Sequence, residues 1–129
     1  MISLSWTLGA LGLFIVKHFV ADFLLQPGWM AKGKAQQRGW LLPAAAHATV
    51  HAVATASIFG LLAPRYLWLA GADLLVHFAI DRAKALVNRA FACEPRSQGF
   101  WLLFGLDQTL HELTNTAFAL VIAVAHSPA

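Results

Sequence analysis

The sequence predicts an all-α polytopic membrane protein, in which four transmembrane helices form an antiparallel bundle within a single domain of residues 1–129. Two observations predict this fold class. Hydrophobic residues make up 59% of the chain and charged residues 12%, which departs strongly from the composition of soluble domains. Prolines also divide the chain into apolar segments that are each long enough to cross a hydrocarbon core about 30 Å thick. These prolines are Pro27, Pro43, Pro64 and Pro95.

The predicted spans cover about residues 2–26, 41–63, 66–91 and 99–125. We expect the first to be retained, because MISLSWTLGALG lacks the basic region of a signal peptide and the apolar run is too long for one. The second contains the alanine-rich run AAAHATVHAVATAS, whose small side chains favour close helix packing. The third and fourth contain DLLVHFAIDRAK and DQTLHE, in which ionisable residues interrupt the apolar pattern. Tryptophans near the predicted ends are typical of the membrane interface.

Each predicted helix carries a row of polar residues at steps of four. The rows are His18, Asp22 and Gln26; His47 and His51; Asp73, His77 and Asp81; and Asp107, His111 and Asn115. Steps of four keep side chains on one helix face, so every row can point at a common interior. An Asp near the centre of a membrane helix costs about 2.5–3.5 kcal/mol, which disfavours a row that faces lipid. Because neighbouring helices are antiparallel, we expect the rows to meet in one polar chamber that opens toward the cytoplasm.

The basic residues predict the orientation of the chain in the membrane. One side of the predicted bundle carries Lys32, Lys34, Arg38, Arg89 and Arg96, and the other carries Arg65. By the positive-inside rule the first side is cytoplasmic, so both termini lie outside. The net charge of +3 is therefore a topology signal, and no nucleic-acid partner is expected. Membrane lipids are the expected partners, with Lys32, Lys34 and Arg38 as candidates for binding anionic head groups.

Mixed His and carboxylate rows on facing helices favour a first-row transition metal, because imidazole nitrogen and carboxylate oxygen suit such an ion. We predict a site for a divalent Zn, Mn or Fe ion. Its candidate ligands are His18, Asp22, His47, His51, His77, Asp81, Asp107 and His111. Which of them bind the ion, and which orient those that do, is left open. Cys93 is the only cysteine, which excludes an internal disulfide and a site of several thiolates.

Three further polar residues have other predicted roles. Gln26 and Asn115 are expected to join helices or to line the chamber. Glu112 lies off the main row, so we predict that it pairs with a residue such as Lys17 or contacts a second copy of the chain.

The site predicts a metal-dependent intramembrane hydrolase that acts from the cytoplasmic leaflet on a lipid with a phosphate or ester group. A divalent ion polarises a substrate oxygen and generates hydroxide from water at neutral pH. Asp22 and Asp107 are the candidate catalytic carboxylates, with a general-base role. Lys84, with Arg82 near it, is the candidate for holding an anionic head group. The sequence offers no Ser–His–Asp or Cys–His arrangement, so covalent catalysis is not expected.

Three alternatives stay open from the residues alone. A small metal-ion or proton transport module, complete only as a homo-oligomer, would need polar residues from one membrane face to the other, and the outer halves of the first two spans have almost none. A bis-His haem protein fits a helical bundle, although carboxylates beside the His residues disfavour it. A structural membrane protein with a polar core would need no metal for its stability.

The motifs KHFVADFLLQPGWMAKGK, HFAIDRAK and DQTLHE, with His47 in the second span, resemble a known family in their order. They are similar, over nearly the whole chain, to the domain of unknown function 3307 family of small bacterial and phage membrane proteins. The resemblance implies an all-helical integral membrane protein but no activity. Together with the orientation predicted from the basic residues, we expect a protein of the bacterial inner membrane with periplasmic termini. The shared positions that it implies are His18, Asp22, Gln26, Lys32 or Lys34, His47, His77, Asp81, Lys84, Asp107, Gln108 and His111. A looser likeness, in size and intramembrane His and Asp, links the chain to membrane-bound metal-dependent hydrolases.

Overall fold

The chain is all-α in the computed structural model, which describes residues 1–127, and this part of the predicted fold class is confirmed. The long helices are α1 (Leu4–Phe19), α3 (Leu41–Leu62), α4 (Leu69–Ala90) and α5 (Gln98–Ala125). A π-helical segment, η1 (Val20–Leu24), continues α1, and the connections hold a short helix, α2 (Gly28–Gly33), and a 3₁₀ turn, η2 (Pro64–Tyr66). The long helices, with η1 added to α1, end within three residues of the predicted segments. Helix α2 is not predicted, because its 6 residues are too few to show a helical period.

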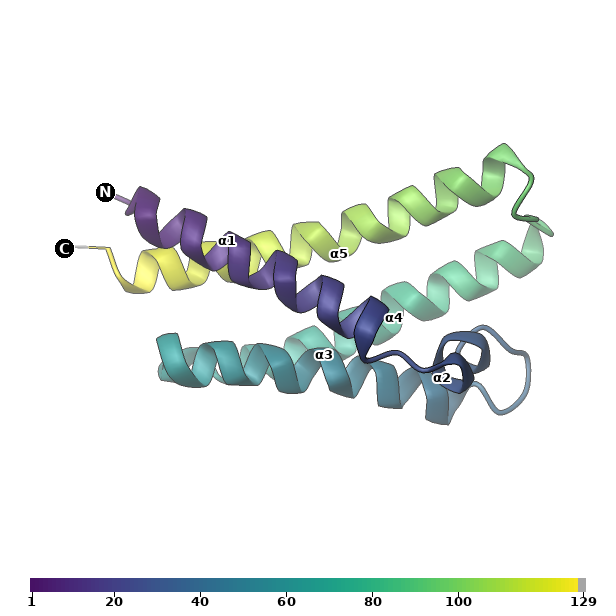
Figure 1. Cartoon of the computed structure of the whole chain (residues 1–129), viewed down its shortest axis with the longest axis horizontal. Helices are drawn as coiled ribbons and strands as arrows, with labels where there is room; N and C mark the ends of the chain where they lie inside the picture. The colour runs from purple at the N-terminus through teal and green to yellow at the C-terminus, as the bar shows by residue number, and fades with distance from the viewer. Residues whose placement is uncertain (128–129) are drawn as a thin grey trace.

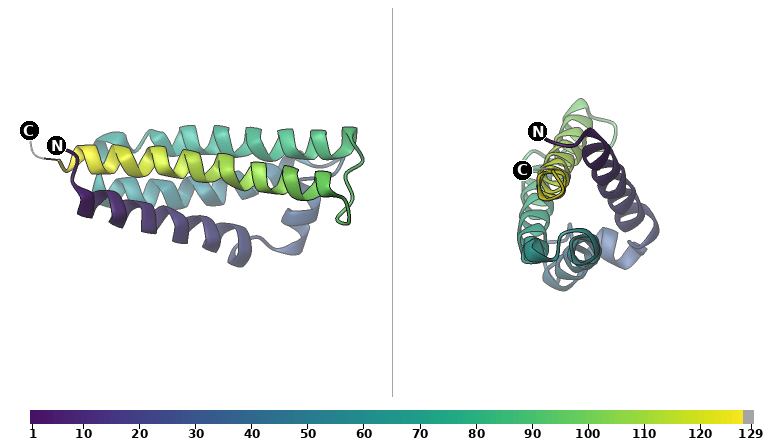
Figure 2. Two further views of the ribbon diagram at one scale, coloured as in Figure 1. Left: turned by 90° about the horizontal axis from the view of Figure 1, so that it is seen from above. Right: turned by 90° about the vertical axis from the view of Figure 1, so that its left-hand side faces the viewer.

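The four long helices run alternately in opposite directions. Helices α1 and α4 run from the end where both termini lie to the end that carries α2, and α3 and α5 run back (Figure 1). We call these the terminal end and the α2 end. Helix α3 packs along α4, and α5 packs along both α1 and α4. Viewed along the long axis, the four helices surround one interior (Figure 2). Residues far apart in the sequence meet along this interior.

The interior holds more ionisable side chains, and the outer surface more large apolar ones, than is usual in a water-soluble protein. His and Asp side chains, together with a Lys and an Asn, are buried between the long helices. Large apolar side chains point outward on the same helices. Leu8, Val53, Leu75 and Leu113, one from each long helix, are all at least 60% exposed. Exposed apolar surface of this extent indicates contact with lipid or with another protein.

Within residues 1–127, two helices are long and apolar enough to cross a membrane, Leu4–Leu24 and Leu41–Leu62. This gives weak support for membrane association. Helices α4 and α5, which fall in the predicted spans 66–91 and 99–125, do not meet the same standard. Their polar rows lower their mean hydropathy, and α4 also carries Arg82, Lys84 and Arg89. A helix of this kind can lie in lipid only where its neighbours cover the polar row.

Three phenylalanines fill the interior toward the terminal end. Phe14, Phe59 and Phe118 come from α1, α3 and α5, and their ring centroids lie 6.1, 5.9 and 5.9 Å apart. Phe14 and Phe59 are fully buried, and Phe118 is 6% exposed. Ala119 and Ile122 pack in the same apolar core. We call the three rings the aromatic layer, and the polar part of the interior lies between this layer and the α2 end.

Gly33 lets α2 dock against α3. A Cβ atom at Gly33 would lie 2.5 Å from Cγ and 2.8 Å from Cβ of Pro43, so a larger residue does not fit. We expect Gly33→Ala to displace α2 and to lower the free energy of unfolding by about 1–3 kcal/mol, the usual cost of overpacking. Thermal unfolding in detergent measures the change. Gly28→Ala is the control, because its Cβ would meet no atom within 4 Å, and equal melting temperatures for the two variants would contradict this docking.

Candidate metal centre

The structure brings all eight predicted metal ligands into one connected group. Nitrogen–oxygen distances of 2.9–3.7 Å link each of these residues to at least one of the others. We call the group the His/Asp cluster; its members are His18, Asp22, His47, His51, His77, Asp81, Asp107 and His111. All of them except the half-buried Asp22 are buried. Five imidazoles and three carboxylates from the four long helices and η1 therefore share one site.

A π-helical turn at the end of α1 places Asp22 in the cluster. The amide of Leu25 donates to the carbonyl of Val20, five residues back, at 2.9 Å. The carboxylate of Asp22 then contacts Nε2 of His18 at 3.0 Å and Nε2 of His51 at 2.9 Å. Turns of this kind are rare and occur frequently at functional sites. The residue spacing alone does not predict this one.

Asp22, His47, His51 and His77 form a group of four donors. One donor atom from each residue lies within 4.8 Å of the other three. Donors around a tetrahedral ion with bonds of about 2.0–2.1 Å lie about 3.3 Å apart. Oδ1 of Asp22 is already 2.9 Å from Nε2 of His51 and 3.2 Å from Nε2 of His47. The group can therefore hold a metal ion after small shifts of its side chains.

His77, Asp81 and His111 form a second donor group, and one donor atom from each again lies within 4.8 Å of the others. Oδ2 of Asp81 is 3.6 Å from Nε2 of His77, and Oδ1 is 3.7 Å from Nε2 of His111. The rings of His51 and His111 stack on His77, with centroids 3.7 and 4.1 Å away. His77 belongs to both groups, and this shared side chain couples them.

Two imidazole side chains at the centre of the cluster carry buried, unpaired nitrogens. Besides Nδ1 of His47, Nε2 of His47 and Nε2 of His77 have no hydrogen-bond partner among the residues that the structure describes. His47 Nε2 lies 3.2 Å from Asp22 Oδ1, but this contact lacks hydrogen-bond geometry. An unpaired buried polar atom costs about 1–3 kcal/mol. A metal ion between the two Nε2 atoms would satisfy both of them, so the residues fit a divalent ion that prefers nitrogen and oxygen ligands.

His18 and Asp107 belong to neither donor group and lie beside them. Nε2 of His18 contacts Oδ2 of Asp22 at 3.0 Å, and Oδ1 of Asp107 lies 3.6 Å from Nε2 of His111. Side chains in such positions orient the metal ligands that they contact. The geometry thus places six of the eight predicted ligands in donor groups and two next to them.

Two lysines from the α2 end reach into the cluster. Nζ of Lys34 donates to Oδ2 of Asp81 at 2.8 Å, and Nζ of Lys84 donates to Oδ2 of Asp107 at 2.7 Å. The sequence predicts Lys84 as part of the site, whereas Lys34 is predicted as a contact for lipid head groups and, with Lys32 as the alternative, as a position shared with the resembled family. The guanidinium of Arg82, the other candidate for holding a head group, lies over the ring of Trp40 at 3.7 Å.

A further polar group lies on the other side of the cluster, toward the aromatic layer. Its members are Lys17, Thr55, Asp73 and Asn115, all of them buried, and we call it the Lys17 group. Nζ of Lys17 donates to Oδ2 of Asp73 at 2.8 Å, and the hydroxyl of Thr55 donates to the same oxygen. Nζ of Lys17 also lies 3.4 Å from Oδ1 of Asn115, whose amide nitrogen is 3.3 Å from Nδ1 of His18. Asn115 of α5 therefore contacts α1, in agreement with its predicted role of joining helices.

The predicted pairing of Glu112 with Lys17 is wrong. Oε1 of Glu112 lies 2.7 Å from Nδ1 of His18, whereas Lys17 is paired with Asp73. Lys17 is also a site residue that the sequence prediction missed. The signal that could have found it is a lone Lys inside an apolar helix, because such a charge needs a buried acid as its partner.

The His/Asp cluster opens toward the α2 end through a pocket of ≈ 240 Å³, which we call the mouth. The polar residues that line it are Asp22, Gln26, Lys34, Asp81, Lys84, Asp107 and Gln108. The side-chain amide of Gln26 donates to the carbonyl of Asp22 at 3.0 Å, so it holds its own turn rather than another helix. Carboxylates from both donor groups are accessible from this side.

Comparison with known proteins gives one match. The model of a family described as "Protein of unknown function (DUF3307)" matches residues 10–128. No curated protein and no solved structure matches the chain. The matched residues include the whole His/Asp cluster, the Lys17 group and both lysines of the mouth.

Proposed function

The chain belongs to the DUF3307 family of proteins of unknown function, and from its site we propose that it is a membrane-embedded metal-dependent hydrolase. Its proposed substrate is a lipid or another phosphoester, reached at the cytoplasmic leaflet. The observation that carries the proposal is the pair of donor groups that share His77 beneath a polar mouth. Buried His and carboxylate donors beside an accessible pocket are the usual arrangement of a hydrolytic metal site.

All four long helices cross the membrane in this proposal. Their outward apolar side chains contact lipid, and their polar rows face one another in the interior. Ionisable residues in a membrane helix are tolerated when they are paired in this way. The α2 end carries Lys32, Lys34 and Arg38, whereas Arg65 lies at the terminal end. The α2 end therefore faces the cytoplasm and both termini face the periplasm of a bacterial inner membrane.

The residues of the cluster have distinct proposed roles. Asp22, His47, His51 and His77, or His77 with Asp81 and His111, would hold a divalent Zn, Mn or Fe ion. Such an ion supplies Lewis acidity and an activated water when it is bound. Oδ1 of Asp107 is buried and has no hydrogen-bond partner within residues 1–127, so it would be available to accept a proton as a general base. Lys84 orients Asp107 through its 2.7 Å hydrogen bond.

The interior favours a hydrolase over a transport module. A path across the membrane would need polar groups from one face to the other. The Lys17 group continues the polar interior beyond the cluster, but the aromatic layer fills the space next to it. The side chains of Phe14 and Phe59 are fully buried in this layer. An interior that is polar at one end suits a reaction chamber better than a channel.

Metal content tests the proposed function. We expect the protein purified in detergent to contain near-stoichiometric Zn, Mn or Fe by mass spectrometry. His47→Ala and Asp81→Ala should each lose this metal, because each removes a donor atom from the centre of the cluster. The wild-type protein should release phosphate or fatty acid from lipids, and Asp107→Asn should keep the metal and lose this activity. A folded protein that contains no metal, and whose melting temperature does not change with a chelator, would contradict the proposal and favour a structural polar core.

A further inference from the structure

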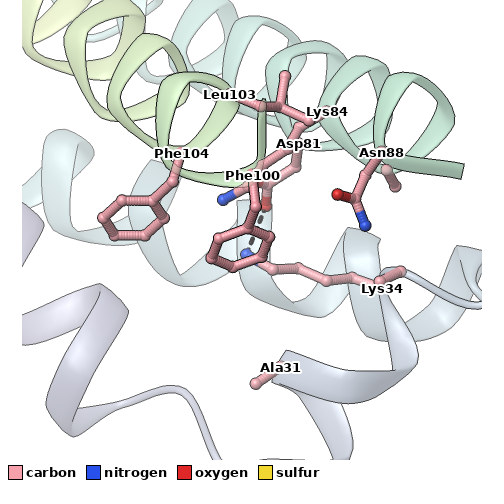
Figure 3. A pocket seen from close by; sticks show the side chains of 10 residues that line it. Ala31, Lys34, Asp81, Lys84, Asn88, Phe100, Leu103 and Phe104 are labelled. Atoms are coloured by element: carbon pink, nitrogen blue, oxygen red, sulfur yellow. Dashed lines mark hydrogen bonds and ion pairs between the residues drawn. The ribbon is translucent and has the colours of Figure 1, made fainter. Parts of the chain in front are cut away.

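A second pocket adjoins the mouth at the α2 end. It has a volume of ≈ 310 Å³ and shares Lys34, Asp81 and Lys84 with the mouth. Phe100 and Phe104 of α5 form its apolar wall beside the polar side chains of Lys34, Asp81 and Asn88 (Figure 3). Nζ of Lys84 lies over the ring of Phe104, 4.9 Å from its centroid. We call it the side pocket. A cavity that brings cationic groups and aromatic rings together suits an anion that carries an apolar chain.

The two lysines are held by carboxylates that a metal ion would also attract. Nζ of Lys34 is 2.8 Å from Oδ2 of Asp81, whose Oδ1 faces His111 at 3.7 Å. Lys84 and Asp107 repeat this arrangement, with distances of 2.7 Å to the lysine and 3.6 Å to His111. A divalent cation among these carboxylates neutralises their charge and repels nearby ammonium groups. Metal binding therefore weakens the attachment of both lysines, which then need another anion.

Asn88 adds an unpaired polar atom at the same place. Its Oδ1 is buried and has no hydrogen-bond partner in the part of the chain that the structure describes. The side chain lines the side pocket together with Lys34 and Lys84 (Figure 3). A hydrogen phosphate group carries an O–H donor for this oxygen and several acceptor oxygens for the two ammonium groups. An uncharged apolar ligand would leave Asn88 Oδ1 unpaired and would offer the two lysines no anion in place of Asp81 and Asp107.

We propose that Lys34, Lys84 and Asn88 form a phosphate-binding subsite that becomes available when a metal ion occupies the His/Asp cluster. This inference rests on the proposed function and specifies the group by which its substrate is held, a phosphate monoester. The lysines exchange the carboxylates of Asp81 and Asp107 for the phosphate oxygens. Because each ligand favours the same arrangement of the lysines, metal and phosphate bind cooperatively, and the coupling is equal in both directions.

Calorimetric titration of inorganic phosphate into metal-free and Zn²⁺-loaded protein tests the coupling. We expect the loaded protein to bind phosphate about 5- to 150-fold more tightly, the usual range of coupling between two sites. Lys34→Met combined with Lys84→Met should abolish this gain and leave the zinc content unchanged or higher. Lys32→Met is the matched control, because Lys32 is an exposed lysine of α2 that lines neither pocket. Equal phosphate affinity with and without zinc would overturn the proposal.

A second variant tests the subsite without any metal. Asp81→Asn combined with Asp107→Asn removes the charges that hold the two lysines. We expect this variant, once circular dichroism has shown that it is folded, to bind phosphate more tightly than the metal-free wild-type protein. Adding Lys34→Met and Lys84→Met should remove the binding. If this variant binds phosphate but the wild-type protein takes up no metal, the metal centre alone is contradicted. If the wild-type protein binds metal but neither test shows phosphate binding, the subsite alone is contradicted.

The source of the phosphate is tested with soluble lipids. Dioctanoyl phosphatidic acid should bind more tightly than inorganic phosphate if the apolar wall of Phe100 and Phe104 holds an acyl chain. Equal affinities would assign the subsite to a free phosphate or to a water-soluble phosphoester. Dioctanoylglycerol has the same acyl chains but no phosphate. If zinc and the lysine substitutions change the affinity for dioctanoylglycerol as they change the affinity for phosphate, recognition of the phosphate group is contradicted.

Discussion

Replacing His77 by alanine is expected to weaken metal binding by more than about 100-fold. Altering a side chain that only orients a ligand costs about 10- to 100-fold in metal affinity, and losing a ligand should cost more. His77 has the largest expected effect because it belongs to both donor groups and its Nε2 is buried without a hydrogen-bond partner among residues 1–127. Competition with a chromophoric chelator measures the affinity.

Two other His variants give graded controls for His77→Ala. His18→Ala should lose about 10- to 100-fold in affinity, because His18 contacts Asp22 but lies outside both donor groups. His126→Ala should change nothing, because this residue stacks on Trp6 at the terminal end, 3.7 Å between ring centroids. If His77→Ala binds metal as tightly as His126→Ala does, the shared centre is wrong.

The same series distinguishes one bound ion from two. His111→Ala removes a donor from the second group and leaves the first group intact. Two equivalents of metal in the wild-type protein and one in His111→Ala would mean that Asp81 and His111 hold a second ion, with the neutral imidazole of His77 bound to only one of the two. One equivalent in both proteins would place the ion in the first group, with Asp81 and His111 supporting it.

The spacing of polar residues predicted which helix faces meet, and its success has a simple cause. Residues at steps of four share a face whatever the neighbouring helices do, so the row of Asp73, His77 and Asp81 has to point in roughly one direction. Apolar surroundings then require that this direction is inward. The depth at which rows meet follows from antiparallel connections between helices of similar length. The all-α class and the meeting of the polar rows follow from these two constraints, whereas the exact position of Asp22 also depends on the π-helical turn.

The details that the sequence could not provide depend on local geometry. Lys17 and His18 are adjacent and differ by about 100° around the helix axis, so a modest rotation of α1 decides which of them meets Glu112. The π-helical turn depends on a single shifted hydrogen bond, from Leu25 to Val20. The contact of Lys34 with Asp81 depends on where α2 docks, and no period in a helix of 6 residues shows that.

Lys17→Met is expected to lower the free energy of unfolding by about 3–5 kcal/mol, because it leaves the carboxylate of Asp73 buried without its cation. The two side chains are 3% and 4% exposed and 2.8 Å apart, so water cannot replace the lost charge. Methionine keeps most of the apolar length of the lysine side chain, which limits the effect to the charge. Denaturant-induced unfolding in detergent micelles measures it, with the exposed Lys32→Met as control.

Combining Lys17→Met with Asp73→Asn should recover most of this loss. A neutral Asn can still accept the hydrogen bond from Thr55 and leaves no buried charge behind. We also expect the double variant to keep its metal. The Lys17 group contacts the His/Asp cluster through the amide of Asn115, 3.3 Å from His18, and neither substitution changes Asn115. A double variant as unstable as Lys17→Met would contradict the ion pair as the source of the effect. Loss of metal from a stable double variant would instead mean that the two polar groups act as one site, so that the charge of Lys17 helps to set the metal affinity.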